Sequence, residues 1–145
     1  MDKLDEKIIE ILKENSKLST RKISKKLMVP ITTVYHRIKR LENNGIIKNY
    51  TVSLNYKKLG KCITAYTLII PDYERLKNDD ITPEELVDKI KKNKTIENIS
   101  LITGRFDIIL KIRVNDIEEL NRFNNNFLLR IHGISKTETL IVLKE

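Results

Sequence analysis

The sequence is poor in the features that build disulfides and membrane spans. Its only cysteine, Cys62, excludes an internal disulfide and fits a reducing cytoplasm. No apolar run approaches the roughly 20 residues that a membrane-spanning helix requires. The amino terminus alternates charges and lacks the apolar core of a secretory signal peptide. These absences predict a cytoplasmic protein without a membrane segment.

The residue sets that carry catalysis are missing as well. The two histidines, His36 and His132, share no apparent site, and no cysteine–histidine set has the spacing of metal ligands. The four glycines form no glycine-rich phosphate loop, and the sequence has neither a nucleophile elbow nor an HExxH pair. We therefore expect no enzymatic activity, no metal and no cofactor.

The positive charge of the chain is concentrated in its first part. The 145 residues carry a net charge of +8. Residues 1–60 hold 14 Lys/Arg against 6 Asp/Glu, whereas residues 61–145 hold 14 of each. Such an asymmetry is expected when a partner carries phosphates. A solvated lysine-rich surface would produce it equally well, so the charge needs a second signal beside it.

That second signal is a pattern of three short helices over residues 1–46. Asp2 is an acceptable N-cap for the first helix, and Ser19 is a stronger one for the second. Pro30 separates the second helix from the third, and Gly45 stands where a left-handed cap ends the third. The last two helices, with the tight bend between them, are typical of a helix-turn-helix.

The third helix is predicted to turn polar and basic side chains away from its apolar stripe. Hydroxyls, an imidazole and long cations can donate hydrogen bonds to base edges and phosphates, as a recognition helix does in the major groove. Arg37 suits an intramolecular ion pair about as well as a phosphate contact. An ordinary solvated helix face is the alternative for the whole set. The predicted DNA-binding residues are Arg21, Lys22, Thr32, Thr33, Tyr35, His36, Arg37, Lys39 and Arg40.

The rest of the chain alternates strands and helices. Residues 47–61 begin with β-branched and aromatic residues that favour a strand, either a wing or a linking strand. Residues 62–145 follow the order βαββαβ of the ferredoxin-like fold, with a charged loop at 72–81 and a helix starting at Thr82. The helix that Asp116 opens is expected to bury Ile117, Leu120, Phe123 and Phe127. The predicted fold class is α+β, with a winged-helix-like three-helix domain before the ferredoxin-like one.

Four stretches of the sequence resemble the Lrp/AsnC family of transcription regulators, also called feast/famine or leucine-responsive regulators. Residues 36–47 are similar to the family signature of Arg, an apolar residue, two basic residues, Leu, Glu, two residues, Gly, an apolar residue and Ile; residues 4–9 also fit. Residues 103–107 resemble the family's turn of Gly, two residues and Asp. Residues 133–134 and 137–139 fit as well, so the resemblance covers essentially the whole chain.

The resemblance implies a DNA-binding homodimer that often assembles further into tetramers or octamers. It assigns residues 1–46 to a helix-turn-helix domain, residues 47–61 to a linking strand, and residues 62–145 to a domain called RAM. RAM domains of the family pack sheet on sheet and bind small effectors, typically amino acids, near the glycine turn. A carboxylate side chain there could bind the ammonium group of an amino acid, and an arginine or a turn N–H could bind its carboxylate. The alternative is a purely structural glycine turn capped by an aspartate, which needs no ligand. The effector-binding residues nominated by the resemblance are Gly104, Arg105 and Asp107, with Thr137 and Thr139 on the last strand.

Three functions are compatible with these features. The first is a sequence-specific, effector-responsive transcription regulator whose two recognition helices lie ~34 Å apart and read a pseudo-palindrome. The second is an architectural DNA-compacting protein, recognisable by steep salt dependence without sequence preference. The third, a metabolite sensor without DNA binding, is disfavoured by the basic first part. Met28 and Pro30 stand where the family usually has a glycine and an N-cap serine, so a local change in the bend is expected.

Overall fold

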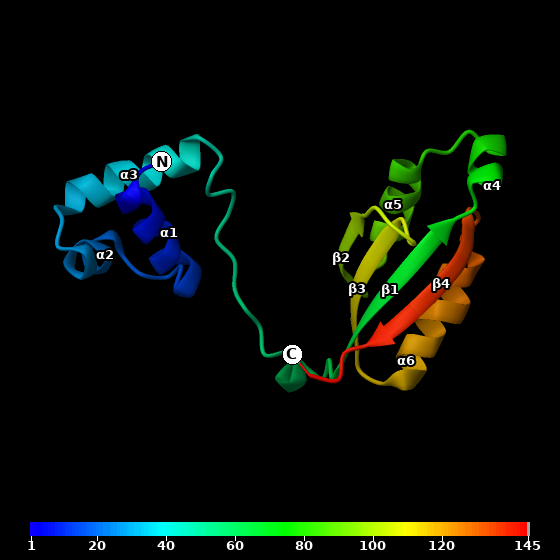
Figure 1. Cartoon of the computed structure of the whole chain (residues 1–145). Helices are drawn as coiled ribbons and strands as arrows, with labels where there is room; N and C mark the ends of the chain where they lie inside the picture. Colours follow the sequence, from blue (N-terminus) through cyan, green and yellow to red (C-terminus); the bar gives the residue numbers. More distant parts are fainter. Residues whose placement is uncertain (145) are drawn as a thin grey trace. The chain divides into compact units, whose positions relative to one another are not determined.

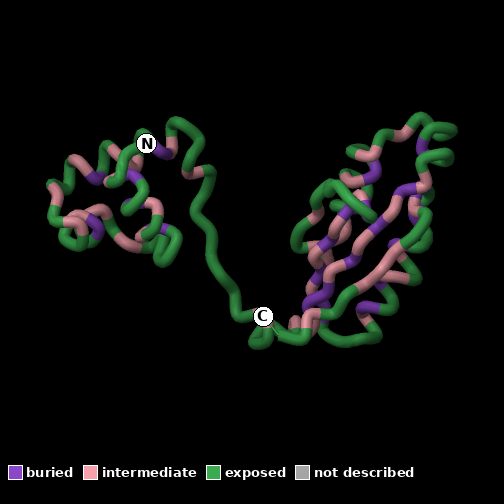
Figure 2. Tube along the Cα trace, in the orientation of Figure 1, coloured by how far each residue is buried: buried purple, intermediate pink, exposed green. Residues whose placement is uncertain are grey.

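A computed structural model describes residues 1–144 and divides the chain into two compact units, Met1–Leu54 and Asn55–Glu145 (Figure 1). Each unit buries its own hydrophobic core, visible as separate groups of buried positions in Figure 2. Among the described residues, no helix is both long and apolar enough to cross a membrane.

The first unit consists of the three predicted helices, α1 (Lys3–Glu14), α2 (Thr20–Leu27) and α3 (Ile31–Asn43). The Asp2 side chain caps α1 in a reciprocal capping box with Asp5, and the Ser19 hydroxyl accepts a hydrogen bond from a backbone N–H of α2. Apolar side chains from all three helices meet in one core, which fixes α3 against α1 and α2. The buried members of this core are Ile8, Leu12, Ile23, Val34 and Leu41.

The bend between α2 and α3 accommodates a residue other than glycine. Met28 adopts a left-handed conformation (φ 53°, ψ 43°), which glycine adopts more easily because it has no Cβ. Its side chain is 92% exposed and so takes no part in the core. The Ser24 hydroxyl donates a hydrogen bond of 2.6 Å to the Val29 carbonyl and closes the bend. Pro30 then precedes α3 without a side-chain cap.

The strand predicted within residues 47–61 is not observed. This segment is irregular until the short 3-10 helix η1 (Tyr56–Leu59). A β-strand needs a neighbouring strand to pair its N–H and C=O groups, and no segment among residues 1–144 pairs with this one. The β-branched and aromatic residues of this segment favour a β-strand, but the described part of the chain provides no neighbouring strand with which it could pair.

The second unit has the predicted βαββαβ order, with one additional helix. The four strands form an antiparallel sheet in the order β2-β3-β1-β4, as in the ferredoxin-like fold. The elements are β1 (Ile63–Pro71), α4 (Tyr73–Asn78), α5 (Pro83–Lys91), β2 (Ile96–Leu101), β3 (Ile108–Val114), α6 (Ile117–Arg122), the π-helix η2 (Phe123–Phe127), the 3-10 helix η3 (Leu128–Arg130) and β4 (Ile134–Ile141).

The helices cover one face of this sheet. Side chains alternate along the strands, so Ala65 and Ile69 of β1 and Leu110 of β3 join the core with Leu86 of α5 and Leu120 of α6. The side chains that alternate with them point to the opposite face, on which most are only partly buried. This second face includes Tyr66, Leu68, Ile109, Lys111 and Arg113.

Two predictions for this unit are wrong. The expected loop at 72–81 contains α4, because Asp72 accepts a hydrogen bond of 3.1 Å from the Arg75 N–H as an N-cap and Leu76 is buried. Ile117 was expected to face the core but is 49% exposed. It is the first residue of α6, and α6 turns Leu120 inward instead.

The segment around η1 is fixed to the partly buried face of the sheet by an aromatic–arginine contact. The guanidinium of Arg113 lies 3.9 Å from the centre of the Tyr56 ring, which is a cation–π geometry. The same guanidinium donates to Glu97 at 2.5 Å and to Thr64 at 2.7 Å. Tyr56 therefore belongs to the second unit, although sequence reasoning placed it in a linking strand.

Candidate nucleic-acid interface and effector site

The structure brings the nine predicted DNA-binding residues together on α2 and α3. On α3, the side chains of Thr32, Tyr35, His36, Lys39 and Arg40 are exposed, and those of Thr33 and Arg37 are partly buried. Arg21 and Lys22 are exposed on α2. This placement follows the helical periodicity, because Val34 and Leu41 on the opposite side of α3 are buried in the core. The outer face of α3 therefore offers hydroxyl, phenol, imidazole and cationic groups to a partner.

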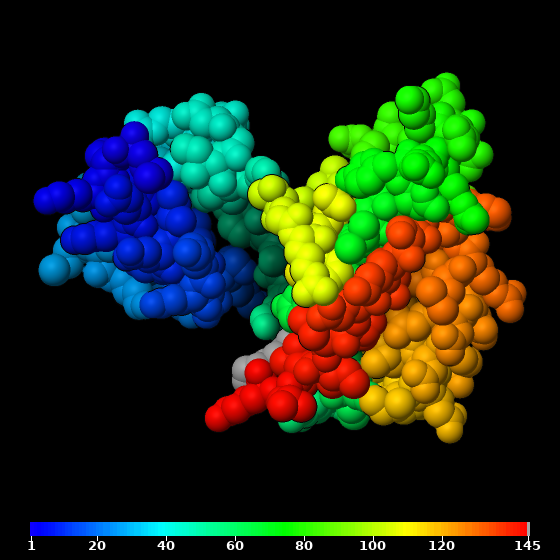
Figure 3. Space-filling model, turned by 45° about the vertical axis from the view of Figure 1, so that its right-hand side comes forward, coloured from blue at the N-terminus to red at the C-terminus, as the bar shows by residue number. Residues whose placement is uncertain are grey.

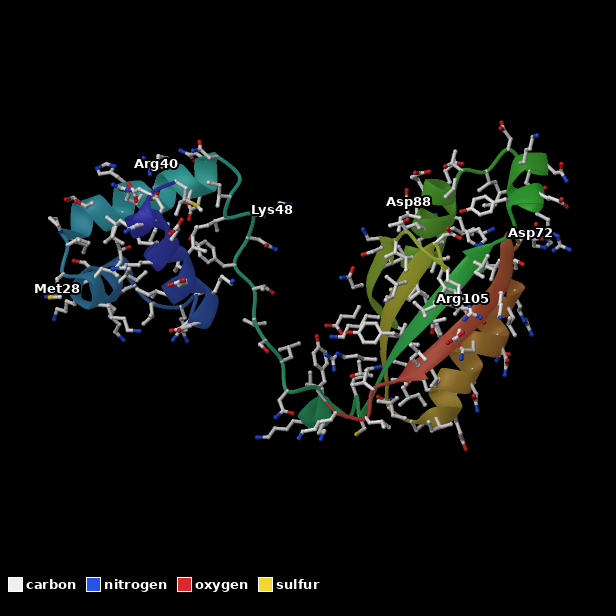
Figure 4. The ribbon with its side chains drawn as sticks, viewed as in Figure 1. Met28, Arg40, Lys48, Asp72, Asp88 and Arg105 are labelled. Carbon is white, nitrogen blue, oxygen red and sulfur yellow. The ribbon has the colours of Figure 1, made fainter. Side chains whose placement is uncertain are left out.

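Two arginines of α3 are held by carboxylates at the start of α1. Asp5 is fully buried, and its two oxygens lie 3.1 Å from Arg37 Nη1 and 2.7 Å from Arg40 Nη2. Figure 4 labels Arg40 on α3. The same Asp5 side chain accepts a hydrogen bond of 3.1 Å from the Asp2 N–H. Arg37 also donates to the Asp2 carboxylate. Arg37 thus forms the intramolecular ion pair that sequence reasoning gave as one of its two possibilities, and the pairs join α3 to α1.

These contacts lower the pKa values of both aspartates. Hydrogen bonding from Arg37, followed by the Asp5 N–H, lowers the pKa of Asp2 to about 2. Burial opposes ionisation of Asp5, but the Asp2 N–H and the Arg37 and Arg40 guanidinium groups outweigh it and lower its pKa. A carboxylate whose pKa is lower in the folded state stabilises that state above its unfolded pKa, and this contribution disappears as pH falls through the folded pKa.

Replacing Arg37 by methionine should therefore destabilise the protein in a pH-dependent way. Methionine keeps much of the apolar stem and removes the charge that lowers the pKa values of Asp2 and Asp5. We expect the variant to unfold at a lower urea concentration than the wild type at neutral pH, and this difference to shrink between about pH 4 and about pH 2. Urea titrations followed by the helical circular dichroism signal measure it. A difference that is constant with pH would contradict the ion-pair explanation.

The third cation of α3 is paired within its own helix. Lys39 Nζ lies 2.8 Å from Glu42 Oε2, and the Tyr50 hydroxyl donates to Glu42 Oε1 at 2.8 Å. Hydrogen bonds from Lys39 and Tyr50 lower the pKa of Glu42, and the Lys39 pKa is raised in turn by its hydrogen bond to Glu42. Burial, followed by the Glu42 hydrogen bond, raises the pKa of Tyr50 to about 12. Sequence reasoning missed Glu42 and Tyr50, although the three-residue spacing of Lys39 and Glu42 on one helix was a readable signal.

The cations of α2 are in a different situation. The helix contains four cations and no acidic residue, and all four side chains are exposed. Within residues 1–144, none of the four takes part in an ion pair. They are Arg21 and Lys22, which were predicted to bind DNA, and Lys25 and Lys26, which were not. The unpaired positive charge beside the outer face of α3 thus lies on α2.

In the second unit, the glycine turn lies between β2 and β3. Gly104 has a φ of +132°, which explains glycine at this position, and a Cβ added there would meet no atom within 4 Å. Arg105 is exposed, with its guanidinium 5.5 Å from the centre of the Phe106 ring. The Asp107 N–H donates to the Ile69 carbonyl at 3.1 Å, which ties the turn to β1. Figure 3 shows the yellow segment that includes this turn at the surface, next to the green segment that includes α4.

Tyr73, the first residue of α4, is a neighbour of this turn that sequence reasoning missed. Burial, together with the nearby Asp107 carboxylate, raises the pKa of Tyr73. No sequence signal pointed to this contact, because residues 72–81 were expected to form a loop. Thr137 of β4 pairs with Ile69, the residue that receives the Asp107 N–H. The turn and Thr137 therefore lie at the same end of the sheet.

Thr139 has a different environment. Its hydroxyl lies 3.1 Å from that of Thr67, which is fully buried, and accepts a hydrogen bond of 3.4 Å from the Asn124 side chain. Thr139 is therefore turned toward the helices that cover the sheet. Of the five nominated effector residues, Gly104, Arg105 and Asp107 lie at the turn, and Thr137 lies at the same end of the sheet. Thr139 is on the same face of β4 as Thr137 and has a polar contact inside the unit. Among residues 1–144, no group of three or more His, Cys, Asp or Glu side chains could hold a metal ion.

Comparisons with known proteins agree with this two-unit arrangement. The family model for the Lrp/AsnC ligand binding domain matches residues 75–145, and the model for winged helix-turn-helix DNA-binding domains matches residues 1–48. The HTH-type transcriptional regulator FL11 of Pyrococcus furiosus is 38% identical to this chain, over 99% of this chain and 90% of the relative. An uncharacterised HTH-type transcriptional regulator of Pyrococcus horikoshii is 36% identical, over 97% of this chain and 91% of the relative.

Solved structures share the fold across the whole chain. LrpC of B. subtilis is 30% identical with a TM-score of 0.82, covering 100% of this chain and 96% of LrpC. AsnC of E. coli is 25% identical with a TM-score of 0.85, covering 100% and 93%. A transcriptional regulator of Neisseria meningitidis, solved in complex with L-methionine, is 24% identical with a TM-score of 0.90, covering 100% and 91%.

Proposed function

The chain belongs to the Lrp/AsnC family of transcriptional regulators, and from this premise we propose that α3 is the recognition helix of a sequence-specific DNA-binding homodimer controlled by an amino acid. The observation that carries the proposal is the exposed polar face of α3 beside the four unpaired cations of α2. The polar face of α3 can read base edges, and the α2 cations can neutralise phosphates.

The proposed DNA contacts divide by chemistry and position. Thr32, Thr33, Tyr35 and His36 lie in the first half of α3, and their hydroxyl, phenol and imidazole groups suit base edges in the major groove. Arg21 and Lys22 of α2 suit phosphates. Arg37, Lys39 and Arg40 lie further back on α3, where each has a carboxylate partner. In a dimer, two copies of α3 would enter major grooves ~34 Å apart and read a pseudo-palindrome. Tetramers or octamers would connect several such sites.

The proposed effector site is the end of the sheet at the β2–β3 turn. The Arg105 guanidinium can bind the carboxylate of a free amino acid, and the Asp107 carboxylate can accept hydrogen bonds from its ammonium group. Together the two side chains suit both charged groups of such a ligand. Tyr73, which lies near Asp107, and Thr137 are proposed to complete the site. The L-methionine complex of the Neisseria meningitidis regulator supports an amino acid as the ligand class.

Replacing His36 by alanine should relax base preference at one position of the operator. A side chain that reads a base edge contributes about 1–3 kcal/mol of discrimination against the wrong base, or roughly 5- to 150-fold. We expect the variant to bind the preferred and substituted duplexes almost equally at that position and to keep its preference elsewhere. Competition binding with single-base variants of the operator measures this. The matched control is His132→Ala in the second unit, which should leave every preference unchanged. Unchanged preferences in the His36 variant would contradict the assignment.

Replacing Asp107 by asparagine should abolish the thermal stabilisation that the effector produces. A ligand at 100 times its Kd stabilises the native state by about 2.7 kcal/mol, and removing the ammonium contact should eliminate most of this. Thermal unfolding in the presence of each of the common amino acids, L-methionine included, measures the shift in Tm. The control is Asp88→Asn, an exposed carboxylate on α5, which should keep the wild-type shift. A full shift in the Asp107 variant would contradict the proposed site.

The same four α2 cations would also serve an architectural DNA-binding protein. Such a protein needs strong phosphate contacts and no base reading, so its affinity would fall steeply with salt and would not depend on sequence. The relaxed preference of the His36 variant distinguishes the two functions, because a protein without base reading has no preference to lose.

A further inference from the structure

All three arginine and lysine side chains of α3 have a carboxylate partner. Arg37 and Arg40 contact Asp5 at 3.1 Å and 2.7 Å, and Lys39 contacts Glu42 at 2.8 Å. Asp5 is buried and joins α1 to α3, so its pairs have a structural explanation. The Lys39–Glu42 pair joins no two helices, because both residues lie on α3.

Glu42 is held in place from two directions. The Lys39 ammonium donates a hydrogen bond to one carboxylate oxygen of Glu42. The hydroxyl of Tyr50, a residue that follows α3 in the chain, donates to the other oxygen at 2.8 Å. The Glu42 side chain is only 26% exposed, whereas that of Lys39 is 51% exposed. These two hydrogen bonds favour one orientation of the Glu42 carboxylate, beside the Lys39 ammonium. The Lys39 ammonium therefore faces solvent together with a fixed negative charge.

We infer that Glu42 is a positioning residue that limits sequence-independent DNA binding by holding the Lys39 ammonium and offsetting its charge on the recognition helix. The inference rests on the proposed function, since it assumes that α3 faces DNA. Binding to any duplex grows with the number of phosphates that unpaired cations neutralise. Because competing non-specific sites far outnumber operators, a recognition helix with little unpaired charge spends less time on random DNA. Attraction to phosphates then comes mainly from the four α2 cations.

The direct test measures binding of the full-length chain to a random-sequence duplex over a series of salt concentrations. Glutamine at position 42 keeps an acceptor for the Tyr50 hydroxyl and removes the charge. We expect Glu42→Gln to steepen the salt dependence by about 0.9 per bound subunit, so that a fourfold rise in salt weakens its binding roughly 3.5-fold more than that of the wild type. Fluorescence anisotropy gives both the affinity and the slope.

Two control variants separate this effect from general changes in charge or structure. Glu10→Gln removes an exposed charge from α1 that is in no ion pair within residues 1–144, so the slope should stay that of the wild type. Tyr50→Phe keeps the Glu42 charge and removes the hydroxyl that holds its carboxylate, so its slope should lie between those of the wild type and Glu42→Gln. An equal steepening in Glu10→Gln would show that only net charge matters and would overturn the inference.

Lys39→Gln completes a double-mutant cycle with Glu42→Gln. With Glu42 present, removal of the Lys39 charge should change the slope little, because that charge is already offset. In the Glu42→Gln background, the same change should remove the gained steepness. A Glu42→Gln slope equal to the wild type, or a Lys39→Gln slope flatter by about 0.9, would overturn the inference. The Lys39→Gln slope tests the inference even if Glu42→Gln fails to fold. A wild-type chain that bound no duplex would instead overturn the proposed DNA interface itself.

Discussion

Glutamine at all four cationic positions of α2 should lower affinity for every DNA duplex by about two to three orders of magnitude at physiological salt. Each phosphate that is no longer neutralised flattens the slope of log affinity against log salt by about 0.9, so four such phosphates per subunit would flatten it by about 3.6. Anisotropy titrations with operator and random duplexes measure both quantities. The substituted residues are Arg21, Lys22, Lys25 and Lys26.

The control for this variant carries the same change in charge elsewhere. Four exposed lysines on and just after α5, in the second unit, can be replaced by glutamine without touching the helix-turn-helix. They are Lys89, Lys91, Lys92 and Lys94. This control should bind both duplexes like the wild type. If both quadruple variants bound more weakly to the same extent, net charge rather than the location of the α2 cations would drive binding.

Gly133→Ala should strongly destabilise the second unit, by about 3 kcal/mol. Gly133 has a φ of +94°, in the left-handed region, where a Cβ costs roughly 1–2 kcal/mol. The added Cβ would lie 2.5 Å from Leu76 Cδ2 and 3.8 Å from Leu86 Cδ1, and both leucines are buried. Overpacking of this kind typically costs about 1–3 kcal/mol more. Urea unfolding followed by circular dichroism measures the decrease in stability.

Gly60→Ala is the matched control for the conformational part of this cost. Gly60 also has a positive φ, +78°, but the nearest atom to its added Cβ is Asn115 Oδ1 at 3.9 Å. Its variant should therefore be less stable than the wild type by only about 1 kcal/mol. Equal destabilisation at both glycines would mean that the clash with Leu76 costs nothing. The close approach of Leu76 also gives a physical reason for Gly133, which sequence reasoning used only as part of a family signature.

Elements with local signals could be predicted from the sequence. The start of α5 has three signals within four residues. They are the N-cap hydroxyl of Thr82, the proline Pro83 in the first turn, and the capping-box glutamate Glu85. Apolar residues at every second position of Ile108–Val114 are likewise a local signal for the buried side of β3. α4 was missed because its six residues contain a single buried apolar side chain, Leu76, too few to establish a period.

The candidate sites were predictable only as far as they depend on one element. Helical periodicity placed His36 on the outer face of α3, since position on a helix follows from spacing alone. The pairing of Arg37 and Arg40 with Asp5 depends on how α1 packs against α3. The paired residues are more than thirty positions apart in the sequence, so no sequence spacing predicts the contact. The inward direction of Thr139 likewise follows from its register opposite Thr67.

The most direct test of the proposed regulator is selection of bound duplexes from a random DNA library at two salt concentrations, followed by sequencing of the retained pool. A dimer reading bases through α3 should enrich a pseudo-palindrome whose half-sites lie about one helical turn apart, ~34 Å, and the motif should persist at the higher salt. A retained pool without any motif, with binding that weakens steeply as salt rises, would contradict sequence-specific recognition and favour the architectural function.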